Sequence, residues 1–193
     1  MNKRAFPKNL KFGTYLPTNS MMGLIKIDVV TKAFERFLSE YFDGIANVKI
    51  NVNAAPTDSI YIAGEHTAYL FRCVMDVIYD GGMMDITVMN NDREYSVCFA
   101  TKKKCNTSDS EKYDRLTEAA TLSGFAYTVV GNMIILRAPL LHGRLVISAF
   151  TYESFYEQLR RVFFAPHWSE YYGEVIERVY GDDGADRDDK KSE

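Results

Sequence analysis

The sequence predicts a two-layer α/β sandwich, in which a mixed, mainly antiparallel sheet is covered on one face by three helices and followed by a C-terminal helical pair. Three observations support this fold class. Segments with apolar residues at helical spacing alternate with short segments in which apolar and polar residues alternate. Two tight-turn sequences each separate a pair of these short segments, which indicates antiparallel hairpins. At 193 residues and 47% hydrophobic side chains, the chain suits one substantial core rather than two full domains.

The N-terminal part of the chain is expected to hold an arm, three strands and a helix. Residues 1–22 contain prolines and glycines without a periodic pattern, so we expect an arm there and a short strand at 23–27. Apolar residues recur at helical spacing across 28–42, which predicts an amphipathic helix. Alternation near 48–52 and near 60–62 predicts two further strands.

A second helix is predicted at the centre of the fold. Its apolar stripe consists of Tyr69, Leu70, Cys73, Val74, Val77 and Ile78. The two glycines at 81–82 are expected to end it. The turn sequence at 90–92 predicts an antiparallel hairpin. Ser108 has capping-box spacing to Glu111, so a third helix is expected to start there and to end at Gly124.

The last part of the chain is expected to form a hairpin, a strand and two helices. Glycine is the first residue of the turn at 131–132, which suits a type II′ turn in a hairpin across 125–137. Residues 144–150 are expected to add one strand. Two aromatic-rich helices are predicted at 152–164 and 168–180.

The negative charge of the chain is concentrated at its C-terminus. Residues 181–193 carry six carboxylates against three basic residues, which accounts for the formal net charge of −3. We expect this segment to be disordered, because it is charged and poor in apolar residues. The rest of the chain is close to neutral and has no basic stripe. This argues against nucleic acid as a partner, since duplex binding depends on neutralising phosphates.

Cysteine usage and hydropathy predict a cytoplasmic protein. The three cysteines show no CxxC spacing, so neither a disulfide framework nor a zinc cluster is suggested. No run of about 18 uninterrupted apolar residues occurs, and no apolar stretch follows the first basic residues. We therefore expect neither a signal peptide nor a membrane-spanning segment.

Two local features accompany the predicted order of elements. Gly64-Glu65 precedes the central helix, and Asp76 and Asp80 stand four residues apart in its second half. Together these features resemble the ATP-binding domain of sensor histidine kinases, in the kinase, gyrase and chaperone superfamily. That family has a Gly-Asp pair before a helix with two N-box side chains four apart. The resemblance covers residues 23–140 and implies an ATP-binding fold in bacterial signalling.

The chain is accordingly divided into four parts. They are an N-terminal arm at 1–22, an ATPase-like domain at 23–150, a helical extension at 151–180 and a disordered acidic tail at 181–193.

The residues with which the family handles ATP are largely missing. Its Asp-x-Gly-x-Gly motif is replaced by Thr101, Lys102, Lys103 and Lys104, and residues 110–116 contain no glycine. Close approach of backbone to phosphate depends on the missing Cβ of glycine. The helices that carry the phosphoacceptor histidine of a complete kinase are also absent from the pattern. We therefore expect no catalytic residues and no autophosphorylation.

Two interpretations of the remaining charged residues stay open. Asp76 and Asp80 would share a helix face, where both carboxylates could bind one Mg²⁺ ion that bridges phosphates. The lysines at 102–104 could then meet the phosphates of ATP. The simpler alternative, which we favour, is an exposed ladder in which Arg72 pairs with Asp76, beside a solvated lysine loop and without a cofactor.

The C-terminal helices carry two apolar stripes that have two interpretations. We favour packing on the sheet, because amphipathic helices at a domain end usually complete its core. The alternative is an interface for a protein partner or a homodimer, since aromatic residues beside arginines are typical of such surfaces. The candidate interface residues are Tyr156, Arg160, Phe163, Trp168 and Tyr172.

The function favoured by the sequence is a non-catalytic regulatory or protein-interaction module derived from a kinase-type ATPase domain. One alternative is a divergent Mg-ATP-binding protein. Another is a small-molecule binder that uses the vacated pocket. Convergence of the lysine loop and the two aspartates on one cavity would favour nucleotide binding, and divergence into solvent would favour the interaction module.

Overall fold

The computed structural model describes residues 22–103, 105, 109–143 and 148–163. Along these residues, strands and helices follow each other in the order that the sequence predicts. The elements are β1 (Met22–Lys26), α1 (Ile27–Tyr41), β2 (Ala46–Asn51), β3 (Ser59–Ala63), α2 (Gly64–Ile78), β4 (Met84–Asn90), β5 (Glu94–Ala100), α3 (Ser110–Ser123), β6 (Ala126–Val130), β7 (Met133–Pro139) and α4 (Tyr152–Phe163).

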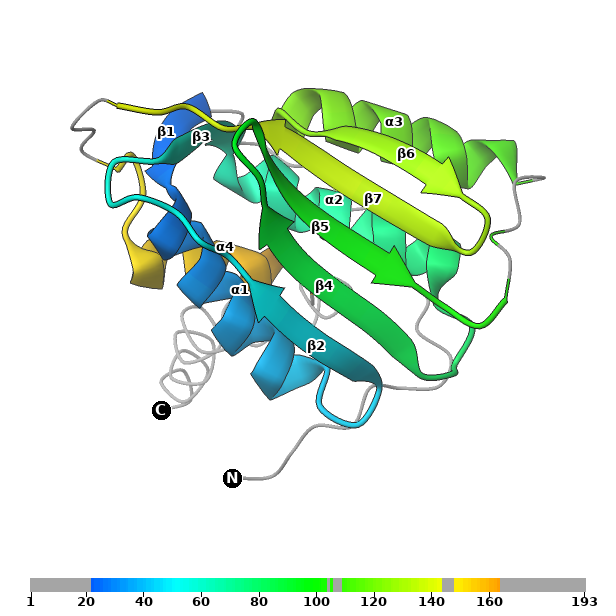
Figure 1. Cartoon of the computed structure of the whole chain (residues 1–193). Helices are drawn as coiled ribbons and strands as arrows, with labels where there is room; N and C mark the ends of the chain where they lie inside the picture. The colour runs from blue at the N-terminus through cyan, green and yellow to red at the C-terminus, as the bar shows by residue number, and fades with distance from the viewer. Residues whose placement is uncertain (1–21, 104, 106–108, 144–147, 164–193) are drawn as a thin grey trace, which may run out of the picture.

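The main sheet contains five strands in the order β2-β4-β5-β7-β6 (Figure 1). β2 runs parallel to β4, and every other neighbouring pair is antiparallel. β1 and β3 form a separate two-stranded antiparallel sheet. The predicted mixed, mainly antiparallel sheet is therefore confirmed, and the prediction is refined by the separation of β1 and β3 from the other strands.

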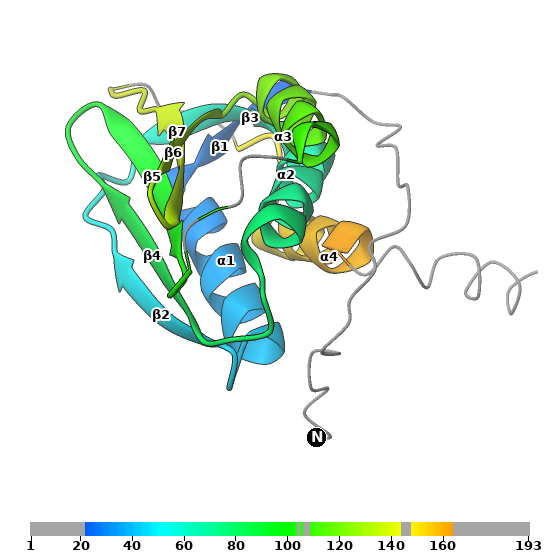
Figure 2. The ribbon, with the colours of Figure 1, turned by 90° about the vertical axis from the view of Figure 1, so that its right-hand side faces the viewer.

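The five-stranded sheet has one buried face and one open face. α1, α2 and α3 lie on the same side of it (Figure 2). Apolar side chains such as those of Ile86, Val97 and Leu136 point to that side and are buried. The residues that alternate with them, among them Asp85, Thr87, Ile135 and Arg137, face away from the helices, as period-two side-chain geometry requires. We call this second side the open face.

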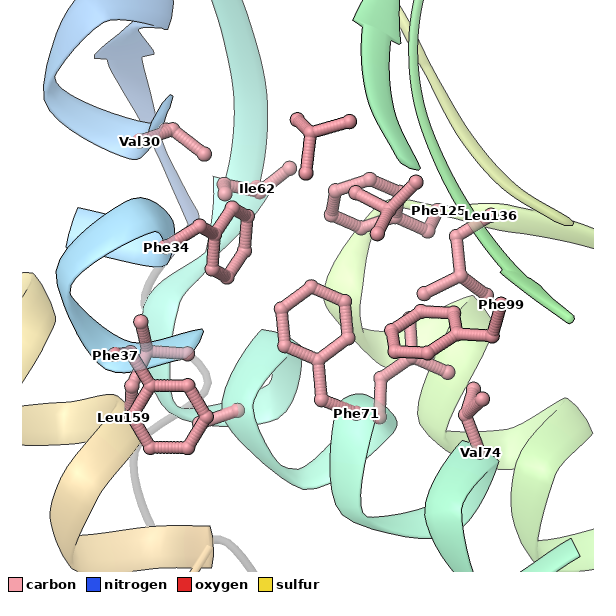
Figure 3. Packing of buried hydrophobic residues seen from close by; sticks show 14 of the residues in the cluster. Val30, Phe34, Phe37, Ile62, Phe71, Val74, Phe99, Phe125, Leu136 and Leu159 are labelled. Carbon is pink, nitrogen blue, oxygen red and sulfur yellow. The ribbon is translucent and has the colours of Figure 1, made fainter. Parts of the chain in front are cut away.

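α2 is the central helix, as predicted. Buried residues occur on every turn around its circumference, since it contacts α3 on one side and α4 on another. Phe71 of α2 packs against Phe34 of α1, with ring centroids 4.5 Å apart, and against Phe99 of β5 at 5.6 Å (Figure 3). These three rings join the first helix, the central helix and the sheet into one core.

α4 packs on the helical layer and not on the sheet, which corrects the favoured prediction for this stripe. It contacts α1 and α2 on the side away from the strands (Figure 2). Phe155, Leu159 and Val162 are buried there, and Phe155 meets Phe34 with centroids 5.5 Å apart. The apolar stripe of α4 is thus used inside the fold, while its outer face is charged.

Several predicted boundaries differ from the structure. Asp109 caps α3, and its side chain accepts a hydrogen bond from the backbone of Lys112, whereas Ser108 lies outside the described residues. Residues 148–150 are not a strand, although the N–H of Ala149 donates to Leu24 of β1 at 2.8 Å. The arm up to residue 21, the strand segment 144–147, the helix at 168–180 and the tail also lie outside the described residues.

The turn at 131–132 follows the prediction. Gly131 has a φ of +62°, and positive φ occurs only at glycines among the described residues, so Asn132 is on the negative side. A positive φ followed by a negative one is the pattern of a type II′ turn. No helix among the described residues is long and apolar enough to span a bilayer.

Candidate functional site

Three of the predicted charged residues lie where α2 ends: Asp76, Asp80 and Lys103, which reaches Asp80 from the loop that joins β5 to α3. α2 ends at Ile78, and Tyr79 is already extended, with a ψ of 119°. Asp76 therefore lies on the last turn of the helix, and Asp80 lies two residues beyond it. The prediction that the two carboxylates share a helix face is wrong, because the helix stops before Asp80 is reached.

Asp76 is held by two cations of α3. Lys112 Nζ lies 3.5 Å from Asp76 Oδ1, and Arg115 Nη2 lies 3.4 Å from Asp76 Oδ2. Lys112 Nζ also donates to the backbone carbonyl of Asp76 at 2.9 Å. The three side chains are only partly exposed. Both carboxylate oxygens thus have cationic neighbours from the same chain, which joins α2 to α3 and neutralises the charge of Asp76.

Asp80 has a different set of partners. Its Oδ1 accepts a hydrogen bond from the backbone N–H of Gly82 at 2.9 Å, and its Oδ2 lies 3.3 Å from Lys103 Nζ. The Gly82 N–H, followed by Lys103, lowers the pKa of the Asp80 carboxyl below its ordinary value. Lys103 is largely exposed, so this ion pair lies at the surface.

The lysine loop is tied to the turn between β6 and β7. Thr101 N–H donates to the Asn132 carbonyl at 3.1 Å, and the Asn132 side-chain amide donates back to the Thr101 carbonyl. Cys105 N–H donates to the Gly131 carbonyl at 3.1 Å, and the Cys105 side chain is buried. Lys102 is exposed, and Lys104 lies outside the described residues. Backbone bonds of the chain itself therefore fix both flanks of the loop.

Arg72 does not form the exposed ladder that the sequence predicts. Its side chain is 2% exposed, and its Nη1 donates to the backbone carbonyl of Val162 in α4 at 3.5 Å. Burial lowers the pKa of this guanidinium. A buried arginine that joins two helices contributes to the packing of α4, so this part of the simpler interpretation is corrected.

The space between α1, α2 and β5 contains a small apolar cavity. Its volume is about 10 Å³, and it is lined by Phe34, Phe37, Leu38, Phe42, Phe71, Met75, Val97 and Phe99. A volume of this size holds at most about one water molecule, and the lining offers no polar partner. This cavity is a packing gap and cannot accept a small-molecule ligand.

The candidate interface residues fall into two groups. Tyr156 is buried against α1. The Arg36 guanidinium lies 4.0 Å from the centroid of the Tyr156 ring, and the Tyr156 hydroxyl donates a hydrogen bond to Glu40. Arg160 is exposed and pairs with Glu157 at 2.8 Å. The Phe163 side chain, Trp168 and Tyr172 lie outside the part of the chain that is described.

Sequence reasoning missed two polar clusters that the fold assembles. The first joins His142 to Asp58 and to the backbone carbonyl of Asp92. The second pairs Arg161 of α4 with the buried Glu65 of α2 at 3.2 Å. Both pair residues that are far apart in the chain, so no local spacing could have indicated them. Within the described residues, no cluster of three or more His, Cys, Asp or Glu side chains could hold a metal ion.

Comparison with known proteins finds similarity at the level of three-dimensional structure. No family model matches the sequence, and no curated protein matches it. Among solved structures, the histidine kinase AdeS of Acinetobacter baumannii is similar with a TM-score of 0.41 and 10% identity, over 67% of this chain and 70% of that one. The catalytic domain of histidine kinase ThkA, in a nucleotide-free form, has a TM-score of 0.43 and 8% identity, over 62% of this chain and 97% of that one. Both of these solved structures are of histidine kinases.

Proposed function

We propose that this chain is a non-catalytic protein-interaction module, built on a kinase-type ATPase scaffold that no longer binds Mg-ATP. The observation that carries the proposal is the pair of contacts from Lys112 and Arg115 to the two oxygens of Asp76. A carboxylate that is already paired with two cations has little free energy to gain from a metal ion, because the ion would first have to displace them.

The loop beside the aspartates supports the same proposal. The family places here the Asp-x-Gly-x-Gly motif that shapes its nucleotide pocket, and this chain has Thr101, Lys102, Lys103 and Lys104 in its place. Thr101 and Cys105 are hydrogen-bonded to the 131–132 turn and buried. Opening this loop for a nucleotide would break those bonds and expose both side chains, and no glycine would compensate by letting phosphate approach.

Nucleotide binding remains the second candidate, because one observation favours it. Lys103 reaches Asp80 at 3.3 Å, so part of the lysine loop and one aspartate do converge. An exposed ion pair is weak, contributing about 0–1 kcal/mol, and a phosphate could replace Asp80 as the partner of Lys103. This candidate requires Asp80 to turn from Lys103 to a magnesium ion when ATP binds.

Isothermal titration calorimetry separates the two candidates. ATP and ADP are titrated into the full chain with and without Mg²⁺, for the wild type, Asp80→Ala and a control variant, Asp85→Ala. Asp85 lies on β4, faces the open side of the sheet and accepts a hydrogen bond from the Asn47 side-chain amide at 3.0 Å. Its loss changes the net charge equally without touching the candidate site.

The proposal predicts no binding heat at millimolar nucleotide in any of the three proteins. Magnesium-dependent binding by the wild type and by Asp85→Ala, with loss in Asp80→Ala, would overturn it and establish a divergent nucleotide-binding domain. Binding that is equal in all three proteins would also overturn it, and would place the nucleotide away from Asp80.

A further inference from the structure

The five-stranded sheet ends in two edge strands of different character. β2 carries Lys49 with its side chain exposed, and lysine on an edge strand is a common protection against pairing with another chain. β6 has the sequence Ala-Tyr-Thr-Val-Val, which contains no charge and no proline and is rich in residues of high strand propensity. The β6 edge therefore lacks the usual devices that prevent strand addition.

The hydrogen-bond pattern of the hairpin fixes which backbone groups of β6 point outward. In a two-residue hairpin, the residues that flank the turn exchange both backbone hydrogen bonds, so Val130 and Met133 form such a pair. Because the pattern repeats every two residues, Thr128 and Ala126 also exchange hydrogen bonds with their partners in β7. The N–H and C=O groups of Tyr127 and Val129 consequently point away from β7. Among the described residues no strand lies beyond β6 to receive them (Figure 1).

We propose that this edge pairs with β6 of a second copy of the chain, antiparallel and about a twofold axis at Thr128. In that register Tyr127 of one copy is opposite Val129 of the other, and each pair exchanges two backbone hydrogen bonds. All four outward N–H and C=O groups of each copy are then used, which neither neighbouring register achieves. The proposal deepens the proposed function by naming a second copy as a partner.

The side chains around the edge fit this pairing. On the open face, the axis places the exposed Val130 opposite the small, exposed Ala126 of the other copy. A large side chain beside a small one fills the space between neighbouring strands without overlap. No charged side chain lies within β6. Arg137 of β7 donates to Thr128 Oγ1 at 2.9 Å and therefore lies beside the axis, where Glu94, 3.8 Å away, offsets its charge.

The neighbouring helix is also compatible with a second copy. Thr117 of α3 shares a 2.8 Å hydrogen bond with the Tyr127 hydroxyl, which places this face of α3 beside β6. Thr121 lies one turn further on the same face. The hydroxyls of Thr117 and Thr121 both donate to carbonyls of their own helix. The two threonine hydroxyls are satisfied, so a second copy can approach them at little desolvation cost. The exposed Asp114, three residues before Thr117, is the charged residue on this side of the helix.

Sedimentation velocity of the full chain over a concentration series tests the proposal. Four backbone hydrogen bonds and a narrow strip of side chains predict a weak dimer, whose average mass rises with concentration. Val129→Pro removes one outward N–H of β6 and leaves the bonds to β7 intact, so it is expected to stay monomeric. Val129→Thr keeps the N–H and the strand propensity, and is expected to dimerise like the wild type.

A disulfide at the axis gives a readout that does not depend on how well the proline variant folds. Residues opposite each other in a non-hydrogen-bonded antiparallel pair have Cα atoms about 4.5 Å apart, within the range that a disulfide spans. Thr128→Cys should therefore form a covalent dimer under mild oxidation. Ala126→Cys is the matched control, because its two copies would lie roughly 14 Å apart along the strands. The wild-type chain, oxidised under the same conditions, measures any cross-linking through its own three cysteines.

A wild-type chain that remains monomeric at the highest soluble concentration overturns the proposal. So does a Val129→Pro variant that folds and dimerises as the wild type does, or cross-linking that is equal for Thr128→Cys and Ala126→Cys. None of these results bears on nucleotide binding, so failure of the dimer and failure of the proposed function are distinguishable.

Discussion

Asp58 Oδ1 and His142 Nδ1 lie 3.0 Å apart, although 84 positions separate the two residues in the sequence. The other ring nitrogen of His142, Nε2, faces the backbone carbonyl of Asp92 at 2.6 Å. A carboxylate and a carbonyl both accept hydrogen bonds, so both ring nitrogens donate and the imidazole is protonated in this arrangement. The contact joins the loop before β3, the turn between β4 and β5 and the segment after β7.

This arrangement predicts that stability depends on pH near neutrality. The Asp92 carbonyl and then the Asp58 carboxylate raise the pKa of His142 above its ordinary value of 6.5. The stabilisation is therefore complete below about pH 6.5 and is lost as the pH rises through the higher folded-state pKa. Thermal unfolding midpoints on both sides of pH 6.5 should fall with pH in the wild type more than in His142→Gln. Equal pH dependence in the two proteins would contradict the prediction.

The helices and strands could be predicted from the sequence because their patterns are local. The apolar stripe of α2 and the turn at 131–132 each need only a few neighbouring residues to be recognised. The burial of Arg72 could not be predicted in this way, since a charged residue at that position becomes buried only when α4 arrives from 90 positions away. The pairing of His142 with Asp58 has the same cause.

The contacts of the candidate site could be predicted from the sequence only in part. Lys103 lies 3.3 Å from Asp80, whereas Asp76 pairs with Lys112 and Arg115. The partners of the two aspartates could not be foreseen, because the extended backbone at Tyr79 separates Asp80 from the helix and α3 brings Lys112 and Arg115 to Asp76. Spacing of four residues indicates a shared helix face only where the helix continues through both residues.

The contact between Tyr156 and Glu40 should stabilise the docking of α4. The Tyr156 hydroxyl donates to Glu40 and is the main cause of the lowered pKa of that carboxyl. We expect Tyr156→Phe to lower the free energy of unfolding by about 1 kcal/mol at neutral pH. The loss should be smaller in acid. A carboxyl group whose pKa is lowered in the folded state stabilises the protein at pH values above its ordinary pKa of 4.5, and this stabilisation disappears as the pH falls through the lower pKa.

Urea denaturation at neutral and acidic pH measures this effect. Tyr152→Phe is the matched control, since the Tyr152 hydroxyl accepts a longer, 3.4 Å hydrogen bond from Arg36 on the same helix pair. It should change the free energy of unfolding less than Tyr156→Phe does. Equal losses in the two variants would show that the hydrogen bond to Glu40 contributes no more than the longer hydrogen bond from Arg36.

The aromatic core should be sensitive at Phe71. Its ring contacts Phe34 of α1 and Phe99 of β5, so truncation would leave a void between three elements (Figure 3). Phe71→Ala is expected to lower the free energy of unfolding by about 3–5 kcal/mol, and Phe71→Leu by about 1.5 kcal/mol or less. Urea denaturation of the leucine variant gives a measurable value even if the alanine variant is unfolded. A loss below about 1 kcal/mol for Phe71→Ala would show that this packing contributes little.

Two glycines with nearly the same positive φ distinguish the cost of a left-handed backbone from the cost of a steric clash. Gly124, after α3, has a φ of +86°, and a Cβ there would lie 2.6 Å from the Tyr61 carbonyl oxygen of β3. Gly44, after α1, has a φ of +84° with nothing within 4 Å of the same Cβ position. Gly44→Ala is expected to cost about 1 kcal/mol, from the left-handed backbone alone.

Gly124→Ala should cost roughly 2–4 kcal/mol, because it adds a clash with backbone that cannot move aside as a flexible side chain does. The difference between the two variants in urea denaturation measures how closely α3 ends against β3. If both variants lose the same stability, the end of α3 must be free to move away from Tyr61, and the close approach of the two elements would not be a constraint on the fold.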